Sequence, residues 1–234
     1  MYLCGMKKVL TLIVCVVAAV NVWAGDDKDY IQVDWYPLCT DSVGWNIYTG
    51  GFVIGWDNAC GIDVSMGRSI DIGWLNVIGT KFKTRHGQRI TMGVGIDWRN
   101  FKLHNDVRFR QDGDNISIAP YPDGAVPKSS RVKVFSLTVP GLLRQRLFST
   151  VDIFAGPVVN FNLHASMETI YTLGGEKVKE SSNKIHQVPV TVDILGGIKW
   201  KFIGAYVRYS PCHVLQERYA PAFTPFTTGI IMGF

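Results

Sequence analysis

Three residues of the chain have the types needed for nucleophilic catalysis, namely His164, Ser166 and Glu168. A histidine beside a serine, oriented by a carboxylate, can activate the serine hydroxyl for attack. The three residues occupy alternate positions, so in a strand they project from one face with about 7 Å between successive Cβ atoms. That spacing is poor for a proton relay, and we interpret the group as the polar base of a loop.

Charged side chains form a second candidate group, because they recur on one face of several predicted strands. Charges that leave water need partners, so such a set either forms ion pairs or lines a hydrated path. Its members are Asp71, Asp97, Arg99, Asp152, Asp193, Lys199, Lys201 and Arg208. No metal site and no cofactor are predicted, because the other histidines lack the spacing of metal ligands: His86, His104, His186 and His213.

Residues 150–164, TVDIFAGPVVNFNLH, show what kind of element carries these charges. Apolar residues from Val151 to Leu163 fall on one parity, and more polar residues from Asp152 to His164 fall on the other. Side chains alternate between the two faces of a strand, so the stretch predicts a long strand with unlike faces. A soluble protein buries the apolar face, whereas an outer-membrane barrel turns it toward lipid.

Similar alternation recurs in eight segments of an all-β chain, and the connections between them alternate between long and short. The segments are residues 45–56, 69–83, 89–102, 131–146, 150–164, 187–202, 204–211 and 226–234. The long connections are residues 57–68, 101–130, 165–186 and 212–225, and the short ones are 84–88, 147–149 and 202–203. Short periplasmic turns and longer external loops are typical of outer-membrane barrels, so we predict an eight-stranded antiparallel up-and-down transmembrane β-barrel.

The two faces of the predicted strands identify the lipid side. In residues 89–102 the bulky apolar side chains from Ile90 to Trp98 share one parity, while Gly93, Gly95 and Asp97 share the other. Glycine fits the tight concave side of a narrow barrel, so we place the polar face in the lumen. By parity His164, Ser166 and Glu168 then also face the lumen. Residues 131–146 break the alternation, which predicts a β-bulge near Val134.

The N-terminus indicates export. Lys7 and Lys8 precede an apolar run that ends before Val22-Trp23-Ala24, so residues 1–24 are predicted to be a secretory signal peptide. Residues 25–43 are expected to form a periplasmic segment and residues 44–234 the barrel. The net charge of +5 falls to +3 once the two lysines are removed, which is too mild to suggest a nucleic-acid partner. Of the cysteines that remain, Cys60 and Cys212 are the only pair that this topology would allow, and whether they form a disulfide stays open.

The chain resembles a known group of membrane proteins at several places. The terminal TTGIIMGF, which ends in Phe234, and segments such as GVGIDWRNF, FAGPVVNFN and VRYSPCHVL resemble the PorT-like, porin-family barrels of Gram-negative anaerobes. The resemblance implies location in the cell outer membrane and recognition of Phe234 by the barrel-assembly machinery. It implies no single function, because that family is functionally mixed.

Three functions remain open from the sequence. The first is a non-enzymatic barrel whose lumen charges form an ion-paired plug, with a role in membrane integrity or in binding through its loops. Arg108, Arg110 and Tyr121 of the longest loop are the candidate residues for contact with lipopolysaccharide or a surface partner. The second is a narrow porin-like channel for small polar solutes. The third is a surface lipid hydrolase, since His164 and Ser166 have a spacing similar to that in the outer-membrane lipid A deacylases.

Overall fold

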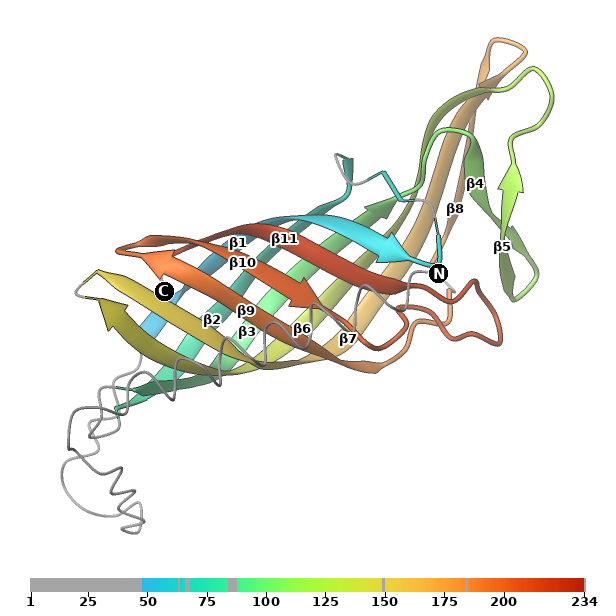
Figure 1. The fold of residues 1–234 in the computed structure, drawn as a ribbon. Helices are drawn as coiled ribbons and strands as arrows, with labels where there is room; N and C mark the ends of the chain where they lie inside the picture. Colours follow the sequence, from blue (N-terminus) through green and yellow to red (C-terminus); the bar gives the residue numbers. More distant parts are fainter. Residues whose placement is uncertain are drawn as a thin grey trace. The chain divides into compact units, whose positions relative to one another are not determined.

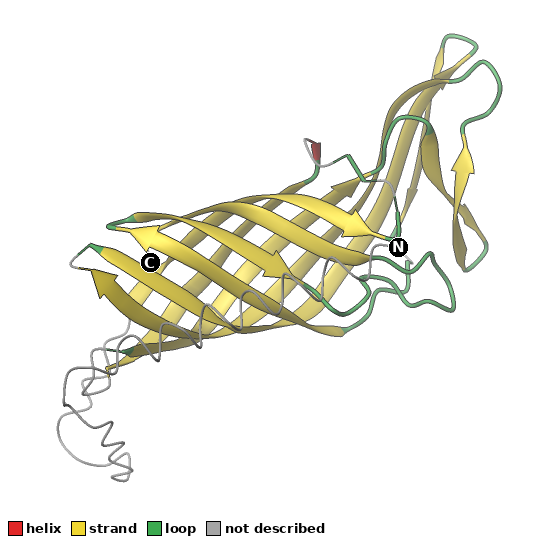
Figure 2. Ribbon diagram, in the orientation of Figure 1, coloured by secondary structure: helices red, strands yellow, loops and turns green. Residues whose placement is uncertain are grey.

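The described part of the chain is almost entirely β-structure (Figure 2). The computed structural model describes residues 48–62, 64–65, 68–83, 88–148, 150–183 and 185–233. The predicted signal peptide, the predicted periplasmic segment and Phe234 lie outside these residues. The strands are β1 (Tyr48–Cys60), β2 (Ile70–Lys83), β3 (Arg89–Lys102), β4 (Val107–Asp112), β5 (Asn115–Pro120), β6 (Val126–Phe148), β7 (Val151–Leu173), β8 (Glu176–Ser182), β9 (Val190–Trp200), β10 (Ile203–Tyr209) and β11 (Thr224–Met232).

Eight of these strands close into a ring, as Figure 1 shows. The order around the ring is β1-β2-β3-β6-β7-β9-β10-β11, and β11 pairs back to β1. Every pairing in the ring is antiparallel, and each strand pairs with its neighbours along the chain once β4, β5 and β8 are set aside. The prediction of an eight-stranded antiparallel up-and-down β-barrel is therefore confirmed.

The two ends of the barrel differ in the length of their connections. At one end, which we call the turn end, few residues separate β2 from β3, β6 from β7 and β9 from β10. Residues 61–69, 103–125, 174–189 and 210–223 join the strands at the opposite end, which we call the loop end. This alternation is the one that the sequence predicts. No helix in the described residues is long and apolar enough to span a membrane.

The loop end carries more strand structure than the sequence suggests. β6 and β7 each run for 23 residues, and β8 pairs with the part of β7 that projects beyond the barrel. β4 and β5 form a separate hairpin next to them (Figure 1). We call this projecting part of β6 and β7, together with β4, β5 and β8, the extension. The prediction that residues 101–130 and 165–186 are loops is therefore wrong in large part, because short apolar alternations such as Phe109, Ile116 and Ile118 pack there.

The β-bulge lies on β7 and not near Val134 of β6. Val132, Val134 and Ser136 are all buried, so β6 keeps one parity across this point. On β7, Phe135 of β6 pairs with His164 and the next residue pairs with Asn162, which leaves Leu163 as the extra residue. The change of pattern in the sequence of β6 has another cause. Its inward-facing side chains are polar inside the barrel and apolar inside the extension.

This bulge reverses the faces of β7. Before it Val158 and Asn160 point inward, and after it Ala165 and Met167 do. A bulge of one residue shifts every later side chain to the other face, because side chains alternate with a period of two. His164, Ser166 and Glu168 therefore face outward, and their predicted orientation toward the lumen is wrong.

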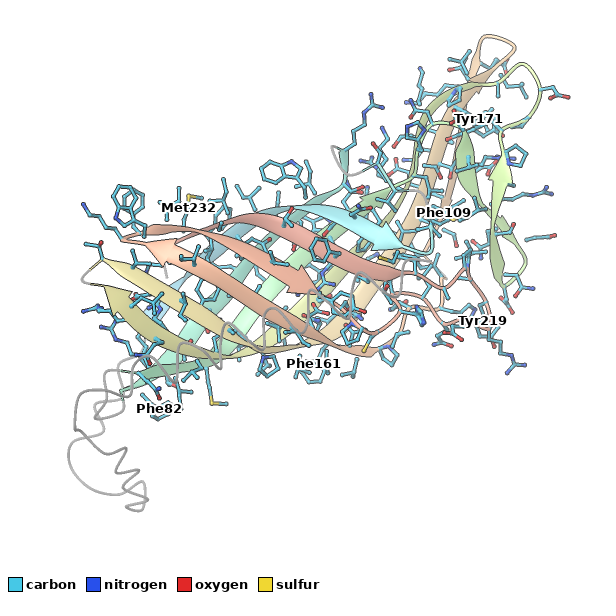
Figure 3. All side chains as sticks on the ribbon, in the orientation of Figure 1. Phe82, Phe109, Phe161, Tyr171, Tyr219 and Met232 are labelled. Carbon is cyan, nitrogen blue, oxygen red and sulfur yellow. The ribbon has the colours of Figure 1, made fainter. Side chains whose placement is uncertain are left out.

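The outer wall of the ring is apolar from Ile90 to Trp98 on β3, a length of nine residues that suits a transmembrane strand. The neighbouring strands continue this belt, as Phe161 on the outer wall of β7 illustrates in Figure 3. Its exposed members include Trp56, Ile72, Trp74, Ile78, Met92, Val94, Ile96, Phe135, Leu163, Val192, Ile194, Ile198, Trp200 and Ile230. A water-facing surface of a monomeric protein rarely shows an apolar band of this size.

Candidate functional site

The predicted lumen charges meet in the middle of the barrel around Asp193 of β9. Its Oδ2 accepts hydrogen bonds from Nε of Arg208, at 2.6 Å, and from Nη2 of Arg99. Nδ2 of Asn160 donates to the same oxygen at 2.8 Å. Asp193 has no exposed surface and Arg208 is 2% exposed, so this is a buried ion-pair network. We call it the lumen network.

The lumen network connects opposite walls of the barrel. Arg208 lies on β10 and Asp97 on β3, four strands apart in either direction around the ring, yet Nη1 of Arg208 is 2.9 Å from Oδ2 of Asp97. The same carboxylate accepts from Nε of Arg99 at 2.9 Å. Nη1 of Arg208 is also 3.4 Å from Oδ2 of Asp71. Five of the eight predicted residues are thus brought together, and their side chains bridge the width of the lumen.

Two further buried residues, one beside the lumen network and one within it, were not predicted from the sequence. Asp57 is fully buried and accepts a hydrogen bond at 2.6 Å from Oγ1 of Thr227. Asp57 comes directly after Trp56, where the sequence predicts the end of the strand. A predicted strand longer by one residue would have included Asp57 among the inward-facing positions. Asn160 bridges Asp193 and Arg208, whose Nη2 donates to Oδ1 of Asn160 at 2.8 Å.

The other three predicted residues lie toward the turn end. Asp152 is opposite Lys199 in the β7–β9 register, and its carboxylate is 3.4 Å from Nε of Arg146 and 3.9 Å from Nε of Arg144. Lys201 does not belong to the lumen. It is exposed in the turn after β9, where its backbone has φ 53° and its Nζ lies 5.3 Å from the centre of the Trp200 ring. Because β9 ends at Trp200, Lys201 lies outside the strand and does not follow the alternation that turns Lys199 inward.

An apolar layer separates these two charged groups inside the lumen. Its buried side chains are Val53, Leu75, Leu142, Phe154, Val158, Leu195, Tyr206 and Ile231. Space is tight here, as the glycines show. A Cβ on Gly73 would lie 2.5 Å from Oδ1 of Asp97 and 3.0 Å from a methyl carbon of Val53. The packing around Asp97 thus favours glycine at position 73, its register partner on the neighbouring strand β2.

A second apolar cluster closes the loop end. It joins the top of the barrel wall to the hairpin and to residues 210–223, through Phe101, Leu103, Phe109, Ile116, Val132, Val134, Ala165, Met167, Ile185, Val214, Leu215 and Phe223. Figure 3 shows Phe109 on β4 within this region. A cavity of about 10 Å³, lined by Arg99, Phe101, Asn162 and Ser210 among others, lies between this cluster and the lumen network. That volume holds about one water molecule.

The candidate binding residues of the longest predicted loop differ in their exposure to solvent. Arg108 is 7% exposed, its Nη1 is 2.7 Å from Oε1 of Glu180, and its guanidinium lies over the Tyr171 ring. Tyr121 packs edge-on against Tyr171, with 5.8 Å between ring centres. Arg108 and Tyr121 thus hold the hairpin against β7 and β8, whereas Arg110 on β4 is exposed.

The outward group on β7 is organised around Glu168 and not around a serine. Oε2 of Glu168 accepts hydrogen bonds from Lys133 at 2.9 Å and from Arg131 at 3.2 Å, and Oε1 is 3.5 Å from Nζ of Lys179. Lys133 donates the hydrogen bond that, with the nearby charges of Arg131 and Lys179, lowers the pKa of Glu168 to about 2. The carboxylate is engaged by cations, so it does not orient His164.

The two cysteines that the structure describes, Cys60 and Cys212, are both free thiols. The pairing that the sequence left open is therefore not formed. In the described ranges, no three His, Cys, Asp or Glu side chains are grouped in a way that would hold a metal ion.

Comparison with known proteins gives a likeness of fold only. No family model matches the chain, and no curated protein matches it by sequence. Among solved structures, the chain is similar to the crystal structure of Ail, the attachment invasion locus protein of Yersinia pestis, in complex with the heparin analogue sucrose octasulfate. The TM-score is 0.35 at 7% identity, and the match covers 80% of this chain and 97% of the Ail chain.

Proposed function

We propose that the protein is an integral outer-membrane barrel with a closed lumen, whose role is to present the extension at the cell surface for binding. This role involves no catalysis. The observation that carries it is the ion pair between Arg208 and Asp97, which bridges opposite walls of the barrel with both side chains about 2% exposed.

The outer wall supports the membrane location. Trp98 is 56% exposed and Ile78 63%, and the belt to which they belong surrounds the ring. Exposing such a belt to water is unfavourable by about 25 cal/mol for each Å² of apolar surface, and lipid removes that cost. A closed ring leaves no unpaired strand edge in the bilayer, which is the requirement for crossing a membrane with strands.

The interior argues for a plug and against a porin-like channel. A solute path would have to cross the apolar layer, the lumen network and the apolar cluster at the loop end. Breaking a buried ion pair by removing one partner costs about 3–5 kcal/mol, because the other charge stays behind unpaired. Small eight-stranded barrels commonly have interiors that side chains fill.

The extension supports a role in binding at the surface. It is not a set of solvated loops, because Phe109, Ile116 and Val132 form a buried core and Arg108 pairs with Glu180. Binding residues are commonly carried by segments that a rigid scaffold positions. The long connections of outer-membrane barrels face the exterior, so the extension is expected outside the cell.

Planar-bilayer conductance tests this function. We expect wild-type protein inserted in a bilayer to conduct almost no current, and Asp97→Ala to open a measurable conductance. Asp123→Ala, at an exposed turn position between β5 and β6, is the matched control and should stay closed. Steady ion conductance in the wild type would reject the closed scaffold in favour of the channel.

A further inference from the structure

The outer wall changes character in a regular order where β3, β6 and β7 leave the belt. Ile96, Leu137 and Phe161 share one register row, and Trp98, Phe135 and His164 share the next outward-facing row. The following rows are Asn100, Lys133 and Ser166, and then Lys102, Arg131 and Glu168. Successive rows are separated by two residues, or about 7 Å along the strand. Cations therefore begin one step beyond the aromatic end of the belt.

Four cations gather in these last rows and beside them. Lys133, Arg131 and Lys179 all contact the single carboxylate of Glu168, and Lys102 is opposite Arg131 in the register. Burial, together with the charges of Arg68 and Arg131, lowers the pKa of Lys102. We call Lys102, Arg131, Lys133 and Lys179 the basic ledge. With Glu168 included it carries a formal excess of three positive charges.

The side chains of the basic ledge remain accessible despite their contacts. The side chains of Lys133, Arg131 and Lys179 are 28%, 31% and 57% exposed, whereas that of Glu168 is 14% exposed. The carboxylate thus lies beneath the cations and holds them in place. Long basic side chains keep their stems on apolar surface and their charged heads in the polar layer, which suits a membrane interface.

The basic ledge occupies one side of the barrel. At the loop-end tips of β1, β10 and β11, the outward positions are Asn58, Tyr209 and Phe226, which form one uncharged register row. If the cations served only to anchor the barrel at the membrane interface, they would be expected around the whole loop end. The concentration on β3, β6, β7 and β8 indicates a ligand bound at one place.

We propose that the basic ledge binds the phosphate groups of a phosphorylated glycolipid of the outer leaflet, whose acyl chains lie on the adjoining belt at Phe135, Leu137 and Phe161. The ligand must be an anion that also carries apolar chains, because the cations follow the belt without an intervening polar surface. Charge-assisted hydrogen bonds from Arg and Lys are the usual means of holding phosphate. This inference rests on the proposed outer-membrane location, and it assigns one surface of that barrel.

Lipid retention measured by native mass spectrometry tests the inference. Full-length protein in detergent micelles is titrated with bis-phosphorylated lipid A, and separately with the same lipid after both phosphates have been removed. We expect wild-type protein to retain the phosphorylated form with at least tenfold preference. Arg131→Gln combined with Lys133→Gln should reduce that retention about tenfold and leave retention of the dephosphorylated form unchanged.

Two further variants make the result specific. Glu168→Gln removes the carboxylate that competes for the cations, so we expect it to increase retention several-fold, an effect that mere loss of structure would not produce. Lys201→Gln combined with Arg218→Gln removes two exposed cations elsewhere, one beside Trp200 at the turn end and one in residues 210–223. This pair should retain the phosphorylated lipid as the wild type does.

The outcomes separate this inference from the proposed function. Equal retention of both lipid forms, or equal loss of retention in the ledge and control variants, would contradict lipid binding at the basic ledge. Neither result would affect the proposal of a closed barrel. Displacement of lipid A by a soluble phosphate polymer at equal phosphate concentration would also overturn it, because the belt would then add nothing. A wild-type sample without the heat-modifiable band of a folded barrel would instead contradict the membrane location itself.

Discussion

Arg208 and Asp97 face each other across the barrel, with 2.9 Å between Nη1 of the arginine and Oδ2 of the aspartate, although their strands are as far apart as the ring allows. Arg99 adds a second connection from β3 to Asp193 of β9. Backbone pairing joins each strand only to its neighbours, so these side chains are what hold opposite walls at a fixed separation.

Arg208→Gln should lower the free energy of unfolding by about 3–5 kcal/mol, because it leaves Asp71, Asp97 and Asp193 without their shared cation. Denaturant unfolding of refolded protein, followed by the loss of the heat-modifiable band, measures the change. Arg218→Gln, at an exposed arginine, serves as the control and should shift the midpoint little. A loss of only about 0–1 kcal/mol for Arg208→Gln would show that water screens the network, as in a hydrated pore.

Gly73→Ala should destabilise the barrel by about 1–3 kcal/mol, since the new methyl group has to displace Asp97 and Val53 from a packed interior. Gly141→Ala is the matched substitution, because the nearest atom to its new Cβ would be the carbonyl oxygen of Pro157 at 4.0 Å. The two midpoints of denaturant unfolding are to be compared. Equal stability of both variants would contradict the close packing of the lumen around Gly73.

Ser130→Ala should release the β4–β5 hairpin and leave the barrel folded. Oγ of Ser130 accepts a hydrogen bond at 2.9 Å from the backbone N–H of Phe109 and lies 2.8 Å from Oγ1 of Thr169, all in the buried interior of the extension. Leaving a buried donor without its partner costs about 1–3 kcal/mol. Limited proteolysis should cut the hairpin faster in this variant than in Ser117→Ala, at an exposed position of β5, while the heat-modifiable band persists in both. Unchanged cleavage would show that these bonds do not anchor the hairpin.

Epitope tags report the orientation of the barrel. Tags placed after Asp114, in the β4–β5 turn, and after Gly174, in the β7–β8 turn, should be labelled on intact cells. A tag after His86, between β2 and β3, should be labelled only after the outer membrane is opened. The reverse pattern would invert the orientation, and equal labelling at all three sites would argue against a spanning barrel.

The ion pairs of the basic ledge should persist through mildly acidic conditions. The pKa of Glu168 is lowered in the folded protein to about 2 from an ordinary value of 4.5, so the stability that these pairs contribute is complete above pH 4.5 and is lost as the pH falls toward 2. Lipid A retention by wild-type protein should therefore be constant between about pH 5 and 8, once titration of the lipid phosphates is corrected with a mono-methylated phosphate analogue. A steep change within that range would show that another group controls binding.

Much of the fold is readable from the sequence, because strand alternation is a local property. The segments 89–102 and 150–164 identify their own faces by the parity of apolar side chains, and the glycines of the polar parity mark the concave side. The alternation of long and short connections then predicts which end of the barrel carries the loops. The composition of the inward face also gave most of the lumen network, since Asp97, Arg99, Asp193 and Arg208 each lie on the parity opposite to the belt.

The tertiary structure decided what depends on register between distant strands. Whether Arg208 reaches Asp97 is set by how the ring closes, and no local pattern encodes that distance. The bulge at Leu163 was likewise unreadable, because His164 and Ser166 continue a regular alternation and the extra residue is defined only against the partner strand β6. That one residue turns Glu168 outward to Lys133 and Arg131. The strands are thus determined by local alternation, whereas the lumen network and the basic ledge are determined by pairing across the chain.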